Sequence, residues 1–195
     1  MPMNIPELVE FLKGKTIAVV GGAPIKDKGK EIDAHDIVIR FNFALTKGYE
    51  IDRGSKLDIQ VVGGNSLFEY YRVKPQCKTL VCFYYKDKTE SLINIGKQFY
   101  RNTVIATGLR RPTTGFFLLY FLRKYSIKAD AYGFNFYKTR NYDRDFLEQQ
   151  LKKYHPTKYE PIAKMSWEKF VEKIIHEPDK EKRFWKKYKW HNFIK

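Results

Sequence analysis

The sequence predicts an α/β fold in which a single, mostly parallel sheet is flanked by helices. Short apolar runs bounded by turn residues alternate with segments of helical or loop character, and this order is typical of a parallel sheet. The 195 residues suffice for one core. The 14 Tyr, 15 Phe and 3 Trp favour a packed globule over a disordered chain.

Six apolar runs are the expected strands. In chain order they are TIAVVGG (16–22), DIVIRFN (36–42), LDIQVVGG (57–64), TLVCFYY (79–85), NTVIATG (102–108) and KADAYGF (128–134). The segments between them that we expect to be helical or in loops include NSLFEYYR (65–72), ESLINIGKQFY (90–100) and TGFFLLYFLRKY (114–125).

The C-terminal part divides into a helix and a tail. Apolar residues at helical spacing predict an amphipathic helix over 167–175, with Ser166 as its N-cap and an end near Pro178. We therefore expect one α/β domain over 1–178 and a basic, aromatic tail over 179–195. Such a tail suits an anionic membrane surface, but a terminal helix packed on the domain explains the same pattern.

The chain is strongly basic, with 37 Lys and Arg against 22 Asp and Glu and a net charge of +15. This charge attracts nucleic acids, nucleotide phosphates or acidic lipids, although a solvated basic surface without a dedicated partner is also open. No signal peptide is recognisable, and the longest apolar run, GFFLLYFL, is too short to span a bilayer. We expect a cytoplasmic protein, either soluble or peripherally bound to a membrane.

Polar residues just after the strands are the first candidates for a site, because ligands of α/β sheets bind outside the carboxyl ends of the strands. Gly21 and Gly22 follow the first strand, where backbone N–H groups can hold a phosphate; a tight turn is the alternative. Asn42 ends the second strand, and its neutral amide can donate to a phosphate or a base edge. Nearby Arg40 favours a structural partner, for which Asp33, Asp36 and Asp52 are available.

Thr113, Thr114 and Gly115 open a segment that is apolar all round. Free N–H groups and hydroxyls at the start of a buried helix form an anion site, since the helix dipole also favours negative charge. A threonine N-cap without a ligand is the equal alternative. The three residues are therefore candidates for binding a phosphate.

The sequence predicts no metal site. Asp143-Arg144-Asp145 matches the D-x-D pattern of some glycosyltransferases, but at a helix start the carboxylates favour capping. His35, His176 and His191 are scattered without ligand spacing.

Three segments, in this order, resemble the motifs of the eukaryotic-type sialyltransferases, which use CMP-activated sugar acids. IAVVGGAPIKDKGKEIDAHDIVIRFNFALTKGYEIDRGSK looks like the large motif, RRPTTGFFLLYFLRKYSIKADAYGF like the small motif, and HPTKYE, with four residues between His155 and Glu160, like the very short motif. Together they span roughly residues 16 to 160.

The resemblance implies a variant, GT-A-like nucleotide-sugar fold with one Rossmann-like sheet, no cofactor, no metal requirement and inversion at the anomeric carbon. It assigns Asn42 to the CMP part of the donor, Thr113, Thr114 and Gly115 to its phosphate or carboxylate, and His155 to the catalytic base. A neutral imidazole can remove the proton of a sugar hydroxyl near pH 7. The implied partners are a CMP-sugar donor, carrying sialic acid or Kdo, and a glycan or glycolipid acceptor.

The chain also departs from this family. Gly22 and Ala23 stand where the family usually has Asn and Ser, and the family's cysteine pair falls at about Thr16 and Ser126. The chain is also short for the family, so a catalytically inactive member is one alternative. A basic nucleic-acid-binding domain is another, although the aromatic residues lie mostly inside apolar runs rather than on a basic face.

Overall fold

The computed structural model describes residues 4–63, 76–77, 80–82, 92–110, 112–139, 142–169 and 177–187. Six strands form one sheet in the order β5-β4-β3-β2-β1-β6, and every pairing among them is parallel. This confirms the predicted single sheet. The strands are β1 (Ile17–Val20), β2 (Ile37–Phe41), β3 (Ile59–Val62), β4 (Leu80–Cys82), β5 (Leu92–Asn94) and β6 (Asp130–Tyr132).

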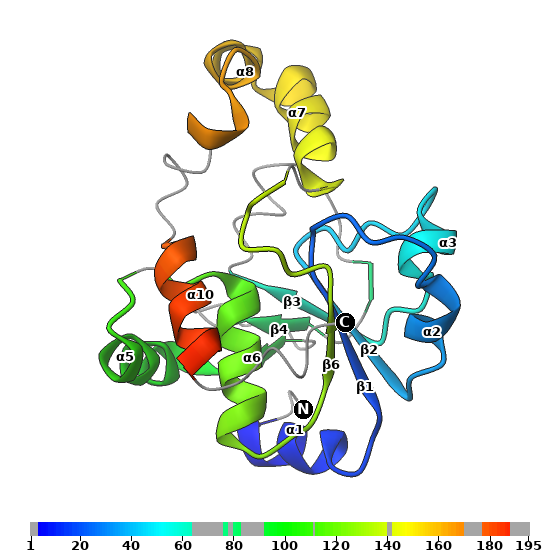
Figure 1. The fold of residues 1–195 in the computed structure, drawn as a ribbon, viewed down its shortest axis with the longest axis vertical. Helices are drawn as coiled ribbons and strands as arrows, with labels where there is room; N and C mark the ends of the chain where they lie inside the picture. The colour runs from blue at the N-terminus through cyan, green and yellow to red at the C-terminus, as the bar shows by residue number, and fades with distance from the viewer. Residues whose placement is uncertain are drawn as a thin grey trace.

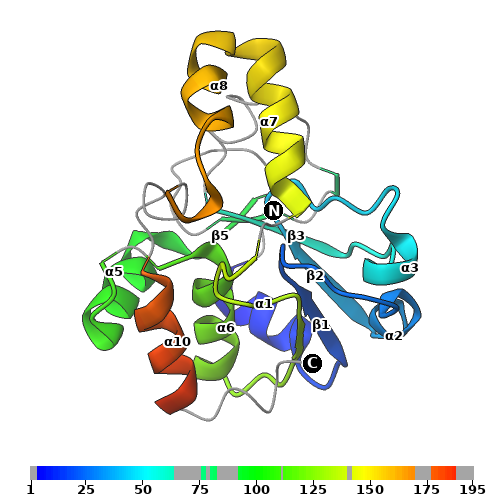
Figure 2. The ribbon, with the colours of Figure 1, turned by 45° about the horizontal axis from the view of Figure 1, so that its top comes forward.

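Helices cover both faces of the sheet, as Figures 1 and 2 show. One face packs on α1 (Ile5–Leu12), α5 (Gly96–Thr107), α6 (Thr114–Lys124) and α10 (Pro178–Lys187), and the other packs on α2 (Gly29–Asp33), with α3 (Glu50–Arg53) beside it. Alternate residues of β1 serve the two sides, Ile17 and Val19 on one and Ala18 and Val20 on the other. The central strands are apolar on both faces for this reason.

The helix α5 corrects one predicted strand. Residues 102–108 were expected to be extended, but most of them form the second half of α5, which ends at Gly108 in a left-handed conformation. Thr103 and Thr107 satisfy their hydroxyls within the helix by donating to the carbonyls of Phe99 and Thr103 at 2.9 and 2.7 Å. β5 lies earlier, at Leu92–Asn94, inside a segment expected to be helical or in a loop. The predicted segment 65–72 lies outside the described residues.

The C-terminal residues 178–187 form α10, which belongs to the domain. Trp185 is 3% exposed and is part of the main core, where its ring lies 6.0 Å from that of Phe134. The boundary predicted at residue 178 therefore falls too early, and the packed-helix alternative holds up to Lys187. Residues 188–195 lie outside the described part of the chain, as does most of the helix predicted over 167–175.

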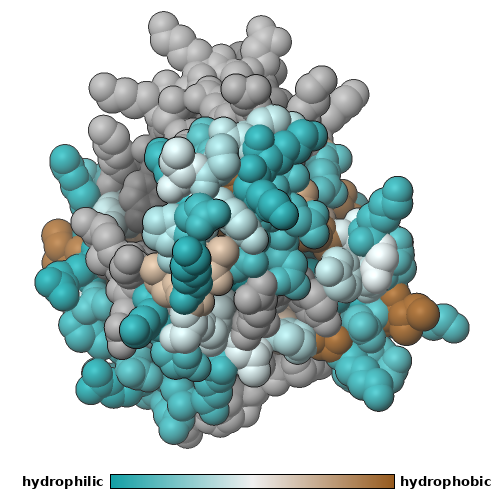
Figure 3. All heavy atoms as spheres, turned by 90° about the horizontal axis from the view of Figure 1, so that it is seen from above, coloured by the Kyte–Doolittle hydropathy of each residue, from teal (hydrophilic) through white to brown (hydrophobic). Residues whose placement is uncertain are grey.

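Two helices project from the domain beyond the carboxyl ends of the strands (Figures 1 and 2). They are α7 (Tyr142–Tyr154) and α8 (Pro156–Ala163). Arg144 fixes their pairing, because its side chain is buried, binds Glu148 at 2.6 Å and donates to the Ile162 carbonyl at 3.1 Å. Figure 3 looks onto this end of the molecule, and its coloured surface is mostly hydrophilic. Among the residues that the structure describes, none of the helices has the length and apolar character needed to cross a bilayer.

Candidate functional site

The order in which the strands are added to the sheet reverses at β1. From β1 the chain proceeds outward to β5, and it then returns through α5 and α6 to place β6 on the other side of β1. The strand order reverses at β1, and the carboxyl edge at this switch point is where open α/β sheets bind ligands. A pocket of about 150 Å³ lies there, lined by Gly21, Gly22, Ala23, Phe41, Asn42, Thr113, Thr114, Gly115, Phe116, Gly133, Phe134, Asn135, Phe136, Tyr137, Glu181 and Trp185.

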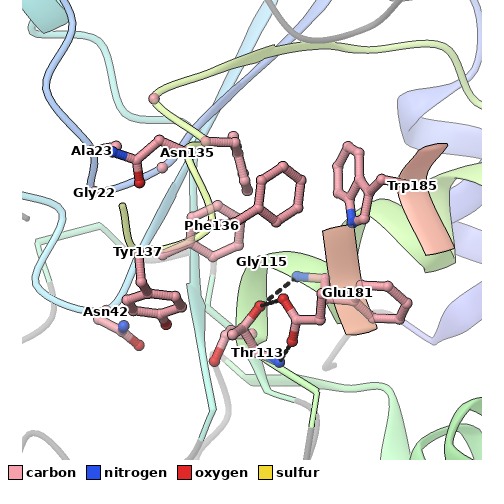
Figure 4. Close-up of a pocket in the computed structure, with 16 residues that line it drawn as sticks. Gly22, Ala23, Asn42, Thr113, Gly115, Asn135, Phe136, Tyr137, Glu181 and Trp185 are labelled. Carbon is pink, nitrogen blue, oxygen red and sulfur yellow. Dashed lines mark hydrogen bonds between the residues drawn. The ribbon is translucent and has the colours of Figure 1, made fainter. Parts of the chain in front are cut away.

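All six residues predicted to bind the donor line this one pocket (Figure 4). They come from three separate places in the sequence: the loop after β1, the end of β2 and the start of α6. Parallel strands end at the same edge of a sheet, and a helix that precedes a strand begins at that edge too. The topology therefore brings together what the sequence keeps apart.

The glycine turn after β1 lies against the turn after β6. Gly21 N–H donates to the Tyr132 carbonyl at 2.7 Å, and Ala23 N–H donates to the Gly133 carbonyl at 3.0 Å. A Cβ on Gly21 would lie 2.4 Å from the Gly133 oxygen, so a larger residue would force the two turns apart. The glycine is required here by close backbone approach, which also leaves room beside the turn.

Arg40 braces the end of β2 from below. Its buried side chain donates to the carbonyls of Lys56 at 2.9 Å and Arg53 at 2.7 Å, and it lies 3.9 Å from Asp33. Burial, together with the nearby Arg53, lowers the pKa of Arg40 to about 10, so the side chain stays charged at neutral pH. Of the three predicted partners, Asp33 is the one the structure places beside it.

Arg53 joins the two loops on either side of the pocket, a role that sequence reasoning missed. Its guanidinium donates to the Gly21 carbonyl at 2.7 Å and to the Leu45 carbonyl at 3.5 Å. These carbonyls belong to the loops after β1 and β2. Nothing in the sequence around Arg53 indicates this contact.

Asn42 lines the pocket, and hydrogen bonds with β3 fix its backbone. The residue has φ 49°, its N–H donates to the Val61 carbonyl at 2.8 Å, and its carbonyl accepts from Gln60 Nε2 at 2.6 Å. Its side-chain amide has no hydrogen-bond partner among the described residues. Asparagine is one of the few residues that adopt this left-handed conformation readily.

The start of α6 is already occupied in part by a carboxylate. Thr113 is the N-cap: its Oγ1 accepts from Phe116 N–H at 3.1 Å and donates to Glu181 Oε2 at 3.0 Å, while its N–H donates to Glu181 Oε1 at 2.6 Å (Figure 4). The N–H groups of Thr114 and Gly115 have no partner within the helix. They are the donors that this anion site offers to a ligand.

Glu181 is the main functional candidate that sequence reasoning missed. Its side chain is 4% exposed, and burial raises its pKa to about 7, against the lowering effect of the two bonds from Thr113. Nearby Glu177 adds to the rise and is itself bound by Lys180 and by the Arg110 N–H. A signal existed: Glu181 stands as far after His176 as Glu160 stands after His155.

Aromatic side chains form the wall of the pocket nearest α10. Phe136 and Tyr137 follow β6 with φ 56° and 60°, a pair of left-handed conformations that is costly for aromatic residues and is typical of functional sites. The Phe136 ring lies 6.0 Å from the ring of Trp185. Trp167 donates to the Tyr137 carbonyl at 2.7 Å and holds the turn from outside.

His155 is not among the pocket residues. It lies between α7 and α8, where its N–H donates to the Leu151 carbonyl at 2.7 Å and its carbonyl accepts from Lys158 and Tyr159. Glu160, its motif partner, is exposed on α8 and bound to Lys164 at 3.4 Å. Glu160 and Glu181 each stand five positions after a histidine, and of these two glutamates Glu181 lines the pocket. His176 lies outside the described residues.

No group of three or more His, Cys, Asp or Glu that could hold a metal ion occurs among the described residues. Asp145 lies at the start of α7, as predicted.

Part of the sequence matches a known family. The family model described as Glycosyltransferase family 29 (sialyltransferase) matches residues 12–94, which include β1 to β5. A relative from Takifugu rubripes, beta-galactoside alpha-2,6-sialyltransferase 2, is 48% identical over 62 residues, or 32% of this chain and 12% of the relative. The human protein of the same name is 40% identical over 57 residues, or 29% of this chain and 11% of its own length.

Two solved structures share the fold. A mammalian sialyltransferase aligns over 100% of this chain and 79% of its own, with a TM-score of 0.56 and 18% identity. A mammalian sialyltransferase in complex with Gal-beta-1-3GalNAc-ortho-nitrophenol aligns over 65% of this chain and 58% of its own, with a TM-score of 0.50 and 21% identity. At these identities the likeness concerns the fold, and it confirms the predicted GT-A-like class. The predicted resemblance is thus confirmed by sequence over residues 12–94, where the chain is similar to the eukaryotic-type sialyltransferases, and the fold agrees with it.

Proposed function

We propose that the protein transfers a sialic acid, or a related keto sugar acid such as Kdo, from a CMP donor to a hydroxyl of a glycan or glycolipid, with inversion at the anomeric carbon. The observation that carries this proposal is the convergence of Gly21, Gly22, Asn42, Thr113, Thr114 and Gly115 on one pocket at the switch point of the sheet. The family match over residues 12–94 supports it.

The donor is held by three kinds of group. The Asn42 amide binds the cytidine part, and the glycine turn at Gly21 and Gly22 lies beside it. The free N–H groups of Thr114 and Gly115 bind the phosphate or the carboxylate, where the helix dipole stabilises a negative charge. Thr113 acts through Glu181 instead, because its N–H and hydroxyl hydrogen are directed at that carboxylate.

We take the acceptor to be a β-galactoside. The sequence relatives carry the name beta-galactoside alpha-2,6-sialyltransferase 2, and this name motivates the choice. In the transfer step an acceptor oxygen bonds to the anomeric carbon as the bond from that carbon to the phosphate breaks. CMP leaves with the electron pair, and a base takes the hydroxyl proton.

The base is a histidine that stands five positions before a glutamate. His155 is the residue that the sequence motif indicates, and His176 is the second histidine in the same relation, to Glu181. The place of Glu181 in the pocket favours His176 over His155.

Parallel substitutions decide between them. His176→Ala should lower transfer about 100- to 10,000-fold with CMP affinity kept, as expected for loss of a positioned base. His155→Ala should change transfer little, and it serves as the matched control. The reverse result assigns the base to His155, and unaffected transfer in both variants removes a histidine base of this kind.

Donor binding and turnover test the function itself. CMP should raise the melting temperature of the protein, since a ligand that binds only the folded state stabilises it, and a short oligonucleotide should not. CMP-sialic acid and CMP-Kdo, assayed side by side for hydrolysis and transfer to lactose, identify the donor. A shift with the oligonucleotide alone supports the nucleic-acid alternative, and CMP binding without turnover of either donor supports an inactive member.

The predicted cytoplasmic location and membrane association remain predictions. Residues 188–195, which include Trp190 and Phe193, carry what is left of the predicted basic and aromatic tail.

A further inference from the structure

A second cavity lies beside the donor pocket and is not used by the function proposed above. It has a volume of about 230 Å³ and opens between α7 and the loop after β2. Its lining consists of Leu45, Thr46, Lys47, Tyr49, Gln76, Asp145, Phe146 and Gln149. None of these residues lines the donor pocket.

The lining has the chemistry that a saccharide requires. Six of the eight residues are polar, and they offer a hydroxyl, an ammonium group, a phenol, two amides and a carboxylate. Sugar hydroxyls donate and accept at once, so a mixed set of donors and acceptors can satisfy them. Leu45, Phe146 and the Tyr49 ring supply apolar surface for the face of a sugar ring.

The two cavities share one wall, the segment from Asn42 to Leu45. Asn42 lines the donor pocket, and three positions later Leu45 lines the second cavity. Gln76 Nε2 donates to the Phe43 carbonyl at 2.5 Å, and the Phe43 ring lies 5.0 Å from the ring of Phe146 on α7. Gln60 Nε2, on β3, donates to the Asn42 carbonyl at 2.6 Å.

Backbone conformation and a hydrogen bond fix the shape of this shared wall. Asn42 and Ala44 both have φ 49°, and Ala44 N–H donates to the Phe41 carbonyl at 2.9 Å. Because Asn42 lines the donor pocket and Leu45, three positions later, lines the second cavity, a group bound in the second cavity lies next to the donor. An acceptor must lie there for its hydroxyl to attack.

We propose that the second cavity binds the acceptor saccharide, with Asp145 and Gln149 hydrogen-bonding to its hydroxyls and Tyr49 packing on its ring. This inference rests on the proposed function, because an acceptor exists only if a sugar is transferred. It adds to that function the place where the acceptor lies and the residues that select it.

Kinetics with separate donor and acceptor titrations test the inference. In Asp145→Asn and Gln149→Ala the KM for lactose should rise about 10-fold or more, as when a hydrogen bond to a charged or buried group is lost. The KM for the CMP donor should stay within about twofold, since neither side chain lines the donor pocket. Both side chains are exposed at the helix surface, so the fold should tolerate the changes.

Lys152→Ala is the matched control, because Lys152 is exposed on the same helix and does not line the cavity. Its KM for lactose should equal that of the wild type. An unchanged KM for lactose in both test variants overturns the inference, and so does an equal rise in both KM values, which indicates a general disturbance of the site.

A second readout separates this inference from the proposed function. If the wild type neither binds CMP nor turns over a donor, the proposed function fails first. Saturation-transfer NMR with lactose alone then decides the cavity: signal that is present in the wild type and lost in Asp145→Asn keeps a saccharide site, and no signal removes it.

Discussion

The buried carboxyl group of Glu181 links the stability of the protein to pH in a narrow window. Its pKa is raised from 4.5 to about 7 in the folded state, so the folded protein binds the proton more tightly than the unfolded chain. The stabilisation is complete below pH 4.5 and is lost as pH rises to about 7, by up to about 3 kcal/mol. The carboxyl groups of Asp36, Glu50, Glu168 and Glu177 have lowered pKa values and act below this window.

Glu181→Gln therefore should remove most of the pH dependence between pH 5 and 7. Gln keeps the shape and one acceptor for Thr113 but does not titrate in this range. Urea unfolding at pH 5, 6 and 7 measures the free energy for both proteins. A wild-type free energy that is flat over this range contradicts the assignment.

Thr113 and Thr114 should respond differently to substitution, although they are neighbours. Thr114→Ala should weaken CMP binding by about 1 to 3 kcal/mol with little change in stability, because it removes a hydroxyl that is available to the anion. Thr113→Ala should mainly lower stability, by about 1 kcal/mol, because it removes the cap of α6. Calorimetric titration with CMP and thermal unfolding of both variants check this. A larger loss of affinity in Thr113→Ala than in Thr114→Ala contradicts it.

Arg53→Lys should loosen the pocket while keeping the charge. An ammonium group cannot reach the Gly21 and Leu45 carbonyls in the forked geometry of a guanidinium. We expect CMP affinity to fall at least about 10-fold while the fold remains, and Lys56→Arg, a change at a half-exposed position nearby, serves as the control. Equal affinities would show that the two loops keep their places without Arg53.

For single residues, the sequence indicated the polar residues that line the pocket, but it did not indicate the buried residues that hold them in place. Gly21, Asn42 and Thr113 are recognisable because each follows a strand or opens a helix. Arg53 and Glu181 act through contacts with residues distant in the chain, Gly21 and Thr113 respectively, and no local pattern encodes such contacts. Two histidines, His155 and His176, stand five positions before a glutamate, and the sequence alone does not choose between them as the base.

At the scale of elements, α10 is the part that sequence reasoning undervalued. Its basic and aromatic residues suited a membrane-facing tail and a packed terminal helix equally, and in the structure Trp185 and Glu181 lie on one face of the helix and are buried in the core and the pocket. The strand predicted at 102–108 failed for a similar reason. β-branched residues favour strands only weakly, and the surroundings of a segment decide its state.

Trp185→Ala should cost about 3 to 5 kcal/mol of stability, as is usual when a large aromatic side chain leaves a core. It should also weaken CMP binding, because α10 then holds Glu181 less firmly at the start of α6. Trp167→Phe, which keeps a ring but loses the bond to the Tyr137 carbonyl, should cost less. Chemical denaturation of the two variants tests this order, and a Trp185→Ala protein of wild-type stability would refute the packing of α10.

At the scale of the whole molecule, the net charge of +15 favours association with anionic surfaces. The cations and rings of residues 188–195 extend this tendency, so a chain that ends at Lys187 should bind vesicles containing phosphatidylserine less tightly and yet keep its stability. Sedimentation with such vesicles, with neutral vesicles as the control, measures the change. Undiminished binding would place the interaction on the folded domain itself.

The central position of β1 has a consequence for how the chain comes to be folded. One edge of β1 pairs early with β2, but its other edge waits for β6, with Ala18 paired to Asp130 and Val20 to Tyr132. During synthesis on the ribosome this apolar edge stays open until most of the chain has emerged, and open strand edges attract other chains. Nascent chains that stall before β6 should therefore aggregate or recruit chaperones, and β1 is the segment where we expect a chaperone to bind them.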